Sequence, residues 1–353
     1  MEKKKKAKSG KRTALKVLCI ILAIILVLLL TVVLFWKNIA AWILGLNLIN
    51  RDIDDSTMSP SEYEEYLQSQ TQSPQPGFTG EVIDPDDVQW EEHDPIESSS
   101  QVINILLIGQ DRREGEGRAR SDAMILCTIN KSTKTLTMTS FLRDMYVQIP
   151  GYQDDRINAS YAFGGMKLLD KVFEKNFGIV VDGNVEVDFG SFKKAIDLTG
   201  GVDINVTSAE ANYLNTHRWE NDLGKTFTAG VNHLNGEQAL AYSRIRAIDS
   251  DFGRTNRQRT VITALINKAK GMSLGEMNRL LKAILPSLTT DMSNSEILGY
   301  AADILPMIGD LKIVNQRIPA DGAYSDAWIR GMLVLLPDLQ KNREVLKDCM
   351  KTK

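Results

Sequence analysis

Cysteine and histidine are scarce in this sequence of 353 residues, with three of each. One cysteine lies in an apolar run near the N-terminus, and the other two, Cys127 and Cys349, are far apart and form no metal-type pair such as C-x-x-C. The histidines at positions 93, 217 and 233 form no ligand pattern. We therefore expect neither a disulfide framework nor a zinc site.

Signals for nucleotide cofactors and for nucleic acid are also lacking. Gly115-Glu116-Gly117 is too short for a dinucleotide fingerprint, and no helical pattern follows it, so no NAD is expected. No helix-turn-helix pattern and no basic stretch with interleaved aromatic residues is present. We expect no nucleic-acid partner, although a nucleic-acid patch is a competing interpretation of the arginines described below.

The N-terminus carries a membrane signal. Eight Lys or Arg residues stand in the first sixteen positions, and an apolar run over 17–36, broken only by Thr31, follows them directly. About 20 apolar residues span a hydrocarbon core roughly 30 Å thick, and the basic cluster stays in the cytoplasm under the positive-inside rule. The pattern predicts one transmembrane helix with the rest of the chain outside the cell. A cleavable signal peptide is the alternative, but its apolar part is usually shorter, about 7–15 residues.

The segment 51–100 is acidic, with fourteen Asp or Glu and one basic residue. It has too few apolar residues for a core, so it is predicted to be a flexible linker. The predicted organisation is a cytoplasmic basic tail (1–16), a transmembrane anchor helix (17–36), a juxtamembrane segment with the acidic linker (37–100) and an extracellular domain (101–345).

The hydrophobic pattern from residue 101 onward mixes strands and helices. Apolar or alternating runs predict strands at 103–108, 123–129, 135–141, 145–149, 185–187 and 202–206. Helical patterns occur at 166–177, 192–198, 237–242 and 257–270, and a capping box at Ser293 opens a helix that ends at Ile304. The mixture predicts an α/β fold in which a central mixed β-sheet is sandwiched by helices. The region after about Met272 is expected to complete this fold.

Two aspartates flank a short polar loop. Asp111 follows the first predicted strand and Asp122 precedes the next one, so both are expected at one edge of the sheet, where open α/β sheets bind ligands. Two carboxylates can hold Mg²⁺ and leave the other positions to water and substrate phosphates. The structural alternative is that Asp111 caps a turn and Asp122 pairs with Arg120.

Arginines gather further along the chain. Arg143 stands at another strand end, and the segment 242–259 carries five arginines against two aspartates. Solvated charge runs usually mix both signs, whereas the planar guanidinium suits bidentate binding of phosphate. The segment is therefore a candidate phosphate-binding site.

Seven sequence blocks lie in order between residues 104 and 259. They are NILLIGQDRR (104–113), RSDAMIL (120–126), SFLRDMYVQIPG (140–151), RINASYAFGG (156–165), GGVDINV (200–206), LNGEQALAYSRIR (234–246) and DSDFGRTNRQR (249–259). As a set they resemble the LytR-CpsA-Psr family of Gram-positive cell-envelope proteins, whose layout also has an anchor and an external domain.

The resemblance implies an Mg²⁺-dependent enzyme, with Mn²⁺ as a possible substitute, that transfers a glycopolymer from an undecaprenyl-pyrophosphate carrier to peptidoglycan at the cell membrane. It places the metal at Asp111 and Asp122, and catalysis at Asp111, Arg143, Arg246 and Arg254. The pyrophosphate-binding residues that it implies are Arg113, Arg120, Arg143, Arg244, Arg246, Arg254, Arg257 and Gln258. Hydrolysis of polyprenyl pyrophosphate and non-catalytic binding of polyprenyl phosphate or wall polymer are the alternatives.

A polyprenyl carrier also requires an apolar channel, because each CH₂ left in water costs about 0.8 kcal/mol. The helix at 166–177, with Leu169, Val172, Phe173 and Phe177 on one face, is a candidate wall of this channel. A plain core face is the alternative for those side chains.

Overall fold

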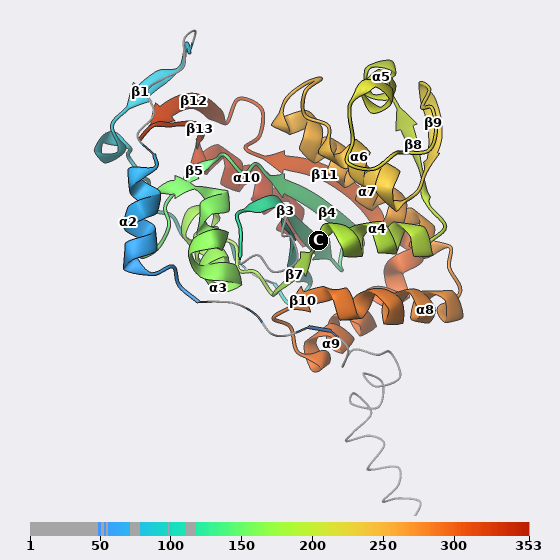
Figure 1. The fold of residues 1–353 in the computed structure, drawn as a ribbon. Coiled ribbons are helices and arrows are strands. Elements are labelled where there is room, and N and C mark those ends of the chain that lie inside the picture. The colour runs from blue at the N-terminus through green and yellow to red at the C-terminus, as the bar shows by residue number, and fades with distance from the viewer. Residues whose placement is uncertain are drawn as a thin grey trace, which may run out of the picture.

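The computed structural model describes residues 49, 50, 53, 56–70, 78–97, 99–110 and 118–352 (Figure 1). The predicted transmembrane helix, Asp111 and Arg113 lie outside these residues. Within the described ranges, no helix is both long enough and apolar enough to cross a bilayer.

A six-stranded sheet forms the centre of the molecule, in the order β10–β7–β2–β3–β4–β11. The pairs β2–β3, β3–β4 and β7–β10 are antiparallel, and β2–β7 and β4–β11 are parallel, so the sheet is mixed as predicted. The strands are β2 (Val102–Gln110), β3 (Ser121–Asn130), β4 (Thr135–Phe141), β7 (Gly183–Val187), β10 (Leu288–Thr290) and β11 (Lys312–Ile318).

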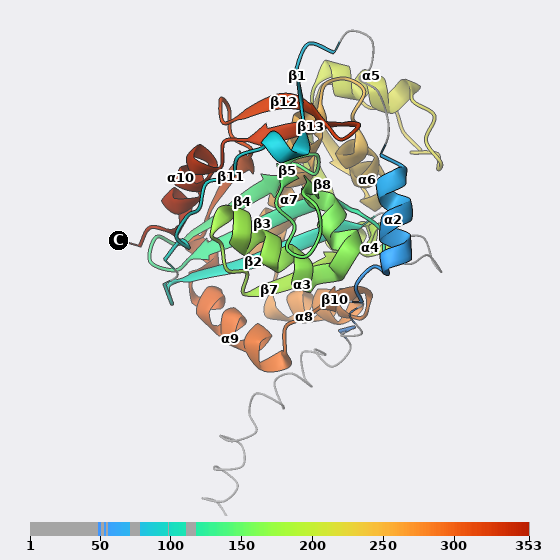
Figure 2. The ribbon, with the colours of Figure 1, turned by 90° about the vertical axis from the view of Figure 1, so that its left-hand side faces the viewer.

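Helices cover both faces of this sheet (Figure 2). Successive residues of a strand point to opposite faces, so Met124 and Leu126 of β3 pack with Phe173 on one face, whereas Ile125 packs with Ile262 on the other. The first face carries α3 (Ile157–Phe177) and α10 (Leu339–Met350). The second face carries α4 (Phe189–Leu198), α6 (Gly236–Arg244), α7 (Asp251–Lys270) and α8 (Leu274–Ile284). The predicted sandwich is confirmed.

Smaller elements surround this core. A three-stranded sheet has the order β1–β12–β13, and β5–β6 and β8–β9 are two-stranded. These strands are β1 (Glu81–Ile83), β5 (Tyr146–Val147), β6 (Asp155–Arg156), β8 (Val202–Val206), β9 (Gly230–Leu234), β12 (Tyr324–Ile329) and β13 (Met332–Pro337). The remaining helices are α2 (Pro60–Gln68), α5 (Ser208–Thr216) and α9 (Asn294–Ile304).

The first helix after the sheet's opening strands begins earlier than the sequence pattern predicts. The prediction started at 166, whereas α3 begins at Ile157 and is kinked at Gly164 and Gly165. Gly165 has φ = +65°, a conformation that favours glycine. The two glycines interrupt the helical periodicity, and this is why the pattern showed only the part after the kink.

The prediction of a flexible linker over 51–100 is wrong for the described residues in that segment. Helix α2 opens with a capping box between Ser59 and Glu62, and its Tyr63 and Tyr66 rings lie 5.3 and 5.0 Å from the ring of Phe163. Ile96 is buried in the core on the α3 face. The segment is acidic in its overall composition, but a few of its apolar side chains pack into the core of the domain. The folded domain therefore begins before residue 101. At its other end, α10 continues past 345 to Met350.

The chain enters the described domain at the edge of the central sheet. The backbone N–H of Asn50 donates to the Leu288 carbonyl at 3.1 Å, and the Thr290 N–H donates to the Asn50 carbonyl at 3.1 Å. Ile49 is buried against Leu285 and Leu298. The entry point is therefore fixed beside β10, close to α8 and α9.

Candidate functional site

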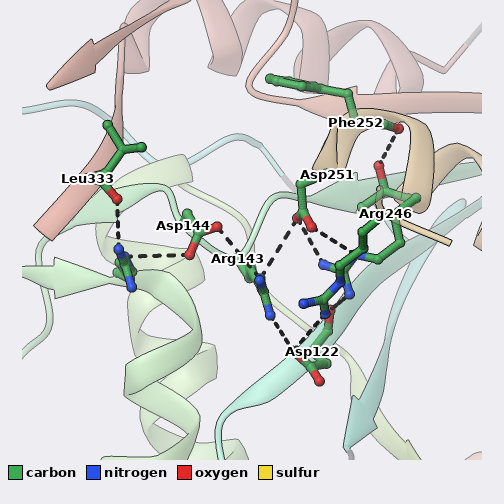
Figure 3. Close-up of polar contacts among 10 residues, drawn as sticks. Asp122, Arg143, Asp144, Arg246, Asp251, Phe252 and Leu333 are labelled. Atoms are coloured by element: carbon green, nitrogen blue, oxygen red, sulfur yellow. Dashed lines mark hydrogen bonds and ion pairs between the residues drawn. The ribbon is translucent and has the colours of Figure 1, made fainter. Parts of the chain in front are cut away.

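Arginines and aspartates from four parts of the chain meet where β3 and β4 approach the N-terminus of α7 (Figure 3). Asp122 lies in β3, and Arg143 follows the end of β4. Arg143 Nη1 donates to Asp122 Oδ1 at 2.7 Å, and Arg246 Nη2, from the loop after α6, lies 3.5 Å from the same oxygen. One carboxylate is thus shared between two guanidinium groups.

Arg254 completes this cluster from the first turn of α7. Its Nε and Nη2 donate to the two carboxylate oxygens of Asp251 at 2.8 Å each, and its Nη1 donates to the backbone carbonyl of Asp122 at 3.1 Å. A two-pronged pair of this kind fixes the plane of the guanidinium. Asp251 also lies 3.9 Å from Arg143 Nε, so it positions two of the arginines at once.

The cluster has a local excess of positive charge. Burial, together with repulsion from Arg254 and Arg143, lowers the pKa of Arg246 from its ordinary value, and Asp122 and Asp251 only partly offset this. Burial also opposes the charge of Arg143, but Asp144, Asp251 and Asp122 outweigh it and raise the pKa of Arg143. Among Arg143, Arg246 and Arg254, Arg246 is therefore the one whose charge its neighbours balance least, and a bound anion would stabilise it.

The cluster opens into a polar pocket that continues into an apolar cavity. The pocket has a volume of about 310 Å³, and its charged lining residues are Asp122, Arg244, Arg246 and Arg254. The cavity has a volume of about 320 Å³ and lies between the sheet and the helices α4, α6, α7 and α8. The two share the lining residues Gly109, Ala123, Phe189, Ser243 and Gln258. One ligand could therefore place a charged group at the arginines and an apolar group in the cavity.

Arg244 and Gln258, both predicted from the sequence, lie at the junction of pocket and cavity. The Arg244 guanidinium lies 5.2 Å from the ring centroid of Phe189, which holds it at the rim. The Oε1 atom of Gln258 is buried without a hydrogen-bond partner in the described structure, so it is available to a donor on a ligand.

The prediction that Arg257 binds pyrophosphate is not supported by its position. Arg257 is 4% exposed, and its Nε donates to Glu210 Oε1 of α5 at 2.7 Å. It also donates to both carboxylate oxygens of Asp249 and to the Ile245 carbonyl. Burial opposes its charge, but the bonds to Asp249 and Glu210 outweigh this and raise the pKa of Arg257. Arg257 thus joins α5 to the loop that carries Arg246.

A glycine in the same motif makes this ion pair possible. A Cβ atom at Gly253 would lie 2.0 Å from Asp249 Oδ2, well inside contact distance. Only glycine lets Asp249 pack against the first turn of α7 and reach Arg257.

The structure separates two other predicted residues from the cluster. Arg120 lies over the ring of Tyr66, with its Cζ 5.2 Å from the ring centroid, and it does not line the polar pocket. Asp111 and Arg113 lie outside the described residues, so their predicted roles stay predictions.

The candidate channel wall at 166–177 is a core face. Leu169, Val172, Phe173 and Phe177 are all 0% exposed and pack against the sheet from the α3 side. The apolar cavity lies on the opposite face of the sheet. Its helical walls come from α4, α6, α7 and α8. No sequence signal distinguishes the apolar residues of a cavity wall from those of a core.

The carboxylates at the polar pocket suit Mg²⁺ only if the ligand supplies part of its coordination. No group of three or more His, Cys, Asp or Glu side chains in the described ranges could hold a metal ion. Asp122 is a half-buried carboxylate at the pocket, and Asp111 would have to supply the second one. One or two carboxylates suit Mg²⁺ when phosphate oxygens and water fill its other positions.

Two acidic residues of the site were not singled out by the sequence reasoning. They are Asp251, which holds Arg254, and Asp144, whose carboxylate lies 3.6 Å from Arg143 Nε. Asp251 stands three residues before Arg254 on a helix, and this spacing was the available signal.

Comparison with known proteins supports a common origin. The model of the LytR_cpsA_psr family matches residues 62–351. A Bacillus licheniformis protein named polyisoprenyl-teichoic acid–peptidoglycan teichoic acid transferase TagU is 38% identical over 239 residues, which are 67% of this chain and 72% of that protein. The solved structure of TagT bound to LIIa-WTA is 30% identical with a TM-score of 0.58, over 74% of this chain and 94% of that one. TagT with bound octaprenyl pyrophosphate lipid is 27% identical with a TM-score of 0.53 over the same shares.

Proposed function

The chain belongs to the LytR_cpsA_psr family, and on this premise we propose that it transfers a glycopolymer from a polyprenyl-pyrophosphate carrier to peptidoglycan. The similar proteins TagU and TagT are named as teichoic acid transferases, and one TagT structure holds octaprenyl pyrophosphate. A teichoic acid is therefore the first polymer to test as the transferred group.

The observation that carries this proposal is the joined pocket and cavity. Three arginines line the polar part, and the apolar part begins at residues that both share. A pyrophosphate attached to a polyprenyl chain has the same division, with its charge at one end and hydrocarbon at the other. The cavity volume of about 320 Å³ accommodates only the part of the chain nearest the head group.

In the proposed reaction, a hydroxyl oxygen of the acceptor attacks the phosphorus that carries the glycopolymer. The new oxygen–phosphorus bond forms as the bond from that phosphorus to the bridging oxygen breaks. Polyprenyl phosphate leaves with the electron pair, and the hydroxyl proton passes to a base. Negative charge on the leaving group increases during this step, and fixed cations aimed at it lower the barrier.

The described arginines have separate parts in this proposal. Arg246, whose charge is balanced least within the cluster, binds the pyrophosphate, and Arg143 adds a second guanidinium beside Asp122. Arg254 is held rigidly by Asp251, so it can stabilise charge without reorganising. The Arg244–Phe189 contact holds a further guanidinium where the pocket meets the cavity, and the side-chain NH₂ of Gln258, which lines both, donates to a phosphate oxygen there.

Mg²⁺ is proposed as the cofactor, with Mn²⁺ as a substitute. Asp122, together with the predicted ligand Asp111, would hold it, and the bound ion would offset the charge of the pyrophosphate. The arginines that now contact Asp122 would then turn towards the phosphate oxygens.

The proposed location is the outer face of the cell membrane, with the anchor at 17–36. The basic residues before it and the apolar run support this topology. With an anchor there, the entry of the chain at Asn50 would bring the edge strand β10 and its neighbours α8 and α9 nearest the membrane.

The proposal is tested with the full-length protein in lipid nanodiscs. Carrier-linked teichoic acid and peptidoglycan are supplied, and polymer bound to the wall and released polyprenyl phosphate are measured. We expect both products in equal amounts with Mg²⁺ present, and neither after chelation. Release of polyprenyl phosphate without wall-bound polymer would identify a hydrolase instead, and no release at all would identify a binding protein.

A further inference from the structure

A second hollow lies far from the entry of the chain, around the loop that joins α5 to β9. It has a volume of about 410 Å³. Its walls include Leu214, His217, Trp219, Asn221, Asp222 and Lys225. None of these residues lines the arginine pocket or the apolar cavity, and the proposed transfer reaction gives them no part.

Aromatic rings form one side of this hollow. His217 lies nearly parallel to Tyr213, with ring centroids 4.8 Å apart, and Trp219 meets His217 edge-on at 4.7 Å. The indole N–H of Trp219 donates to the Leu214 carbonyl at 3.1 Å. The indole N–H is thus satisfied within the protein, and the part of the ring that does not pack against the core remains for contact. His217 is exposed.

Polar side chains also line the hollow. Asn221 donates one bond to Glu237 at 3.1 Å, and Lys225 donates to the His233 carbonyl at 2.5 Å above the ring of Phe227. Asp222 is exposed. A concave surface that combines aromatic rings with a few polar groups is typical of a small-molecule subsite.

We propose that this hollow binds a glycan strand built of N-acetylated amino sugars. A pyranose ring with equatorial substituents presents flat faces of C–H groups that pack against aromatic rings, and its hydroxyl and amide edges pair with Asn, Asp and Lys. That this glycan is the acceptor of the reaction rests on the proposed function. That it binds in the hollow can be tested independently of that function.

The position of the hollow fits an acceptor that arrives from the wall. In both views of the molecule α5 lies at the top and α8 and α9 at the bottom, where the chain enters beside β10 (Figures 1 and 2). A carrier in the membrane and a glycan in the wall would therefore approach from opposite ends of the domain.

The hollow is also rigidly connected to the arginine cluster. The bond from Arg257 to Glu210 ties α5 to α7, and the bonds from Arg257 to Asp249 and Ile245 tie it to the loop of Arg246. A glycan held beside α5 is thus held in a constant position relative to the pyrophosphate site.

The test measures binding of the N-acetylglucosamine hexamer to the full-length protein in nanodiscs by calorimetry. Trp219→Ala removes the largest ring, and His217→Ala removes the exposed ring that contacts both Tyr213 and Trp219. The matched control is His233→Ala, an exposed histidine on the neighbouring strand β9 that does not line the hollow. We expect the Kd to rise about tenfold for Trp219→Ala and about threefold for His217→Ala, and to stay constant for His233→Ala.

Absence of hexamer binding to the unaltered protein, or equal binding by all three variants, would overturn the inference. Trp219 also packs against the core beneath β8 and β9, so if Trp219→Ala does not fold, His217→Ala alone decides. The readout needs no carrier lipid. If the protein transfers polymer to the wall but does not bind the hexamer, only this inference is wrong. If it binds the hexamer through these rings but transfers no polymer, only the proposed function is wrong.

Discussion

Arg246 and Arg257 both lie in the arginine-rich segment 242–259, but they differ in burial and in the number of carboxylates that neutralise them. The Arg246 side chain is 45% exposed, and its Nη2 lies 3.5 Å from Asp122 Oδ1. Arg143 contacts the same carboxylate. The Arg257 side chain is 4% exposed and has two carboxylates within hydrogen-bonding distance. An arginine neutralised inside the protein stabilises the fold, whereas one short of negative charge is free to bind an anion. Two predictions test this difference directly; a third tests the apolar cavity beside Arg246, and a fourth tests a second buried arginine pair, in order from the largest expected effect to the smallest.

Arg257→Ala is expected to lower the free energy of unfolding by about 3–5 kcal/mol, because it leaves the buried Glu210 and the Asp249 carboxylate without their cation. Chemical unfolding of the full-length protein in detergent measures this. The matched variant Arg246→Ala should shift stability by less than about 0.5 kcal/mol. Equal stability losses in the two variants would show that the two arginines are not different in kind.

Arg246→Ala is expected to reduce wall transfer about 10²–10³-fold, equivalent to about 2.7–4 kcal/mol of barrier. Arg246→Lys should be nearly as damaging, because lysine keeps the charge but loses the planar pair of donors. Initial rates with carrier-linked polymer check this. Normal rates in the lysine variant would mean that charge alone suffices at this position.

Ala195→Phe is expected to reduce bound polyprenyl lipid about tenfold, since the ring would fill the apolar cavity that Ala195 lines. Lys194→Phe adds the same ring to the exposed side of α4 and is the control. Mass spectrometry of lipid that co-purifies with each variant gives the result. If both variants lose lipid equally, the cavity is not the binding site for the chain.

Tyr66→Phe tests the surroundings of another buried ion pair, Arg330–Asp155, and a smaller loss of stability is expected. Asp155 is fully buried, accepts from Tyr66 Oη at 2.9 Å and pairs with Arg330 at 2.8 Å. Because the ion pair remains, the variant should lose only about 1 kcal/mol of stability and become more sensitive to protease within 51–100. Unchanged cleavage in that segment would indicate that α2 is held by ring packing alone.

The sequence predicted the regular parts of the fold well. Strands β4 and β8 have the predicted bounds, and Arg143 follows the strand end at which the pattern put it. That Arg143 and Arg246 meet at Asp122 agrees with the site that the family resemblance implied. Local periodicity and strand ends are properties that neighbouring residues determine, so they can be read from a single chain.

Long-range pairings could not be predicted in this way. Arg257 and Arg254 look alike in the motif, and only the fold places Glu210, 47 residues away, against Arg257. The side of the sheet that carries the cavity depends on how tightly α4, α7 and α8 approach it. The packing of α2 against the domain depends on a few aromatic rings. The overall acidic composition of the segment gives no sign of these rings' contribution.

With the proposed anchor at 17–36, the pairing of Asn50 with the sheet edge would change the effective concentration of the site at the membrane. A tether of 64 residues (37–100) would let the domain sample a wide volume, but the proposed anchor leaves only twelve residues (37–48) before the fixed entry point. Effective concentration falls roughly as the −3/2 power of tether length, so the shorter tether raises it about tenfold. Encounters with carriers then become nearly two-dimensional. The enzyme would work as a short-range surface catalyst, and the wall strand rather than the domain must cross the remaining gap.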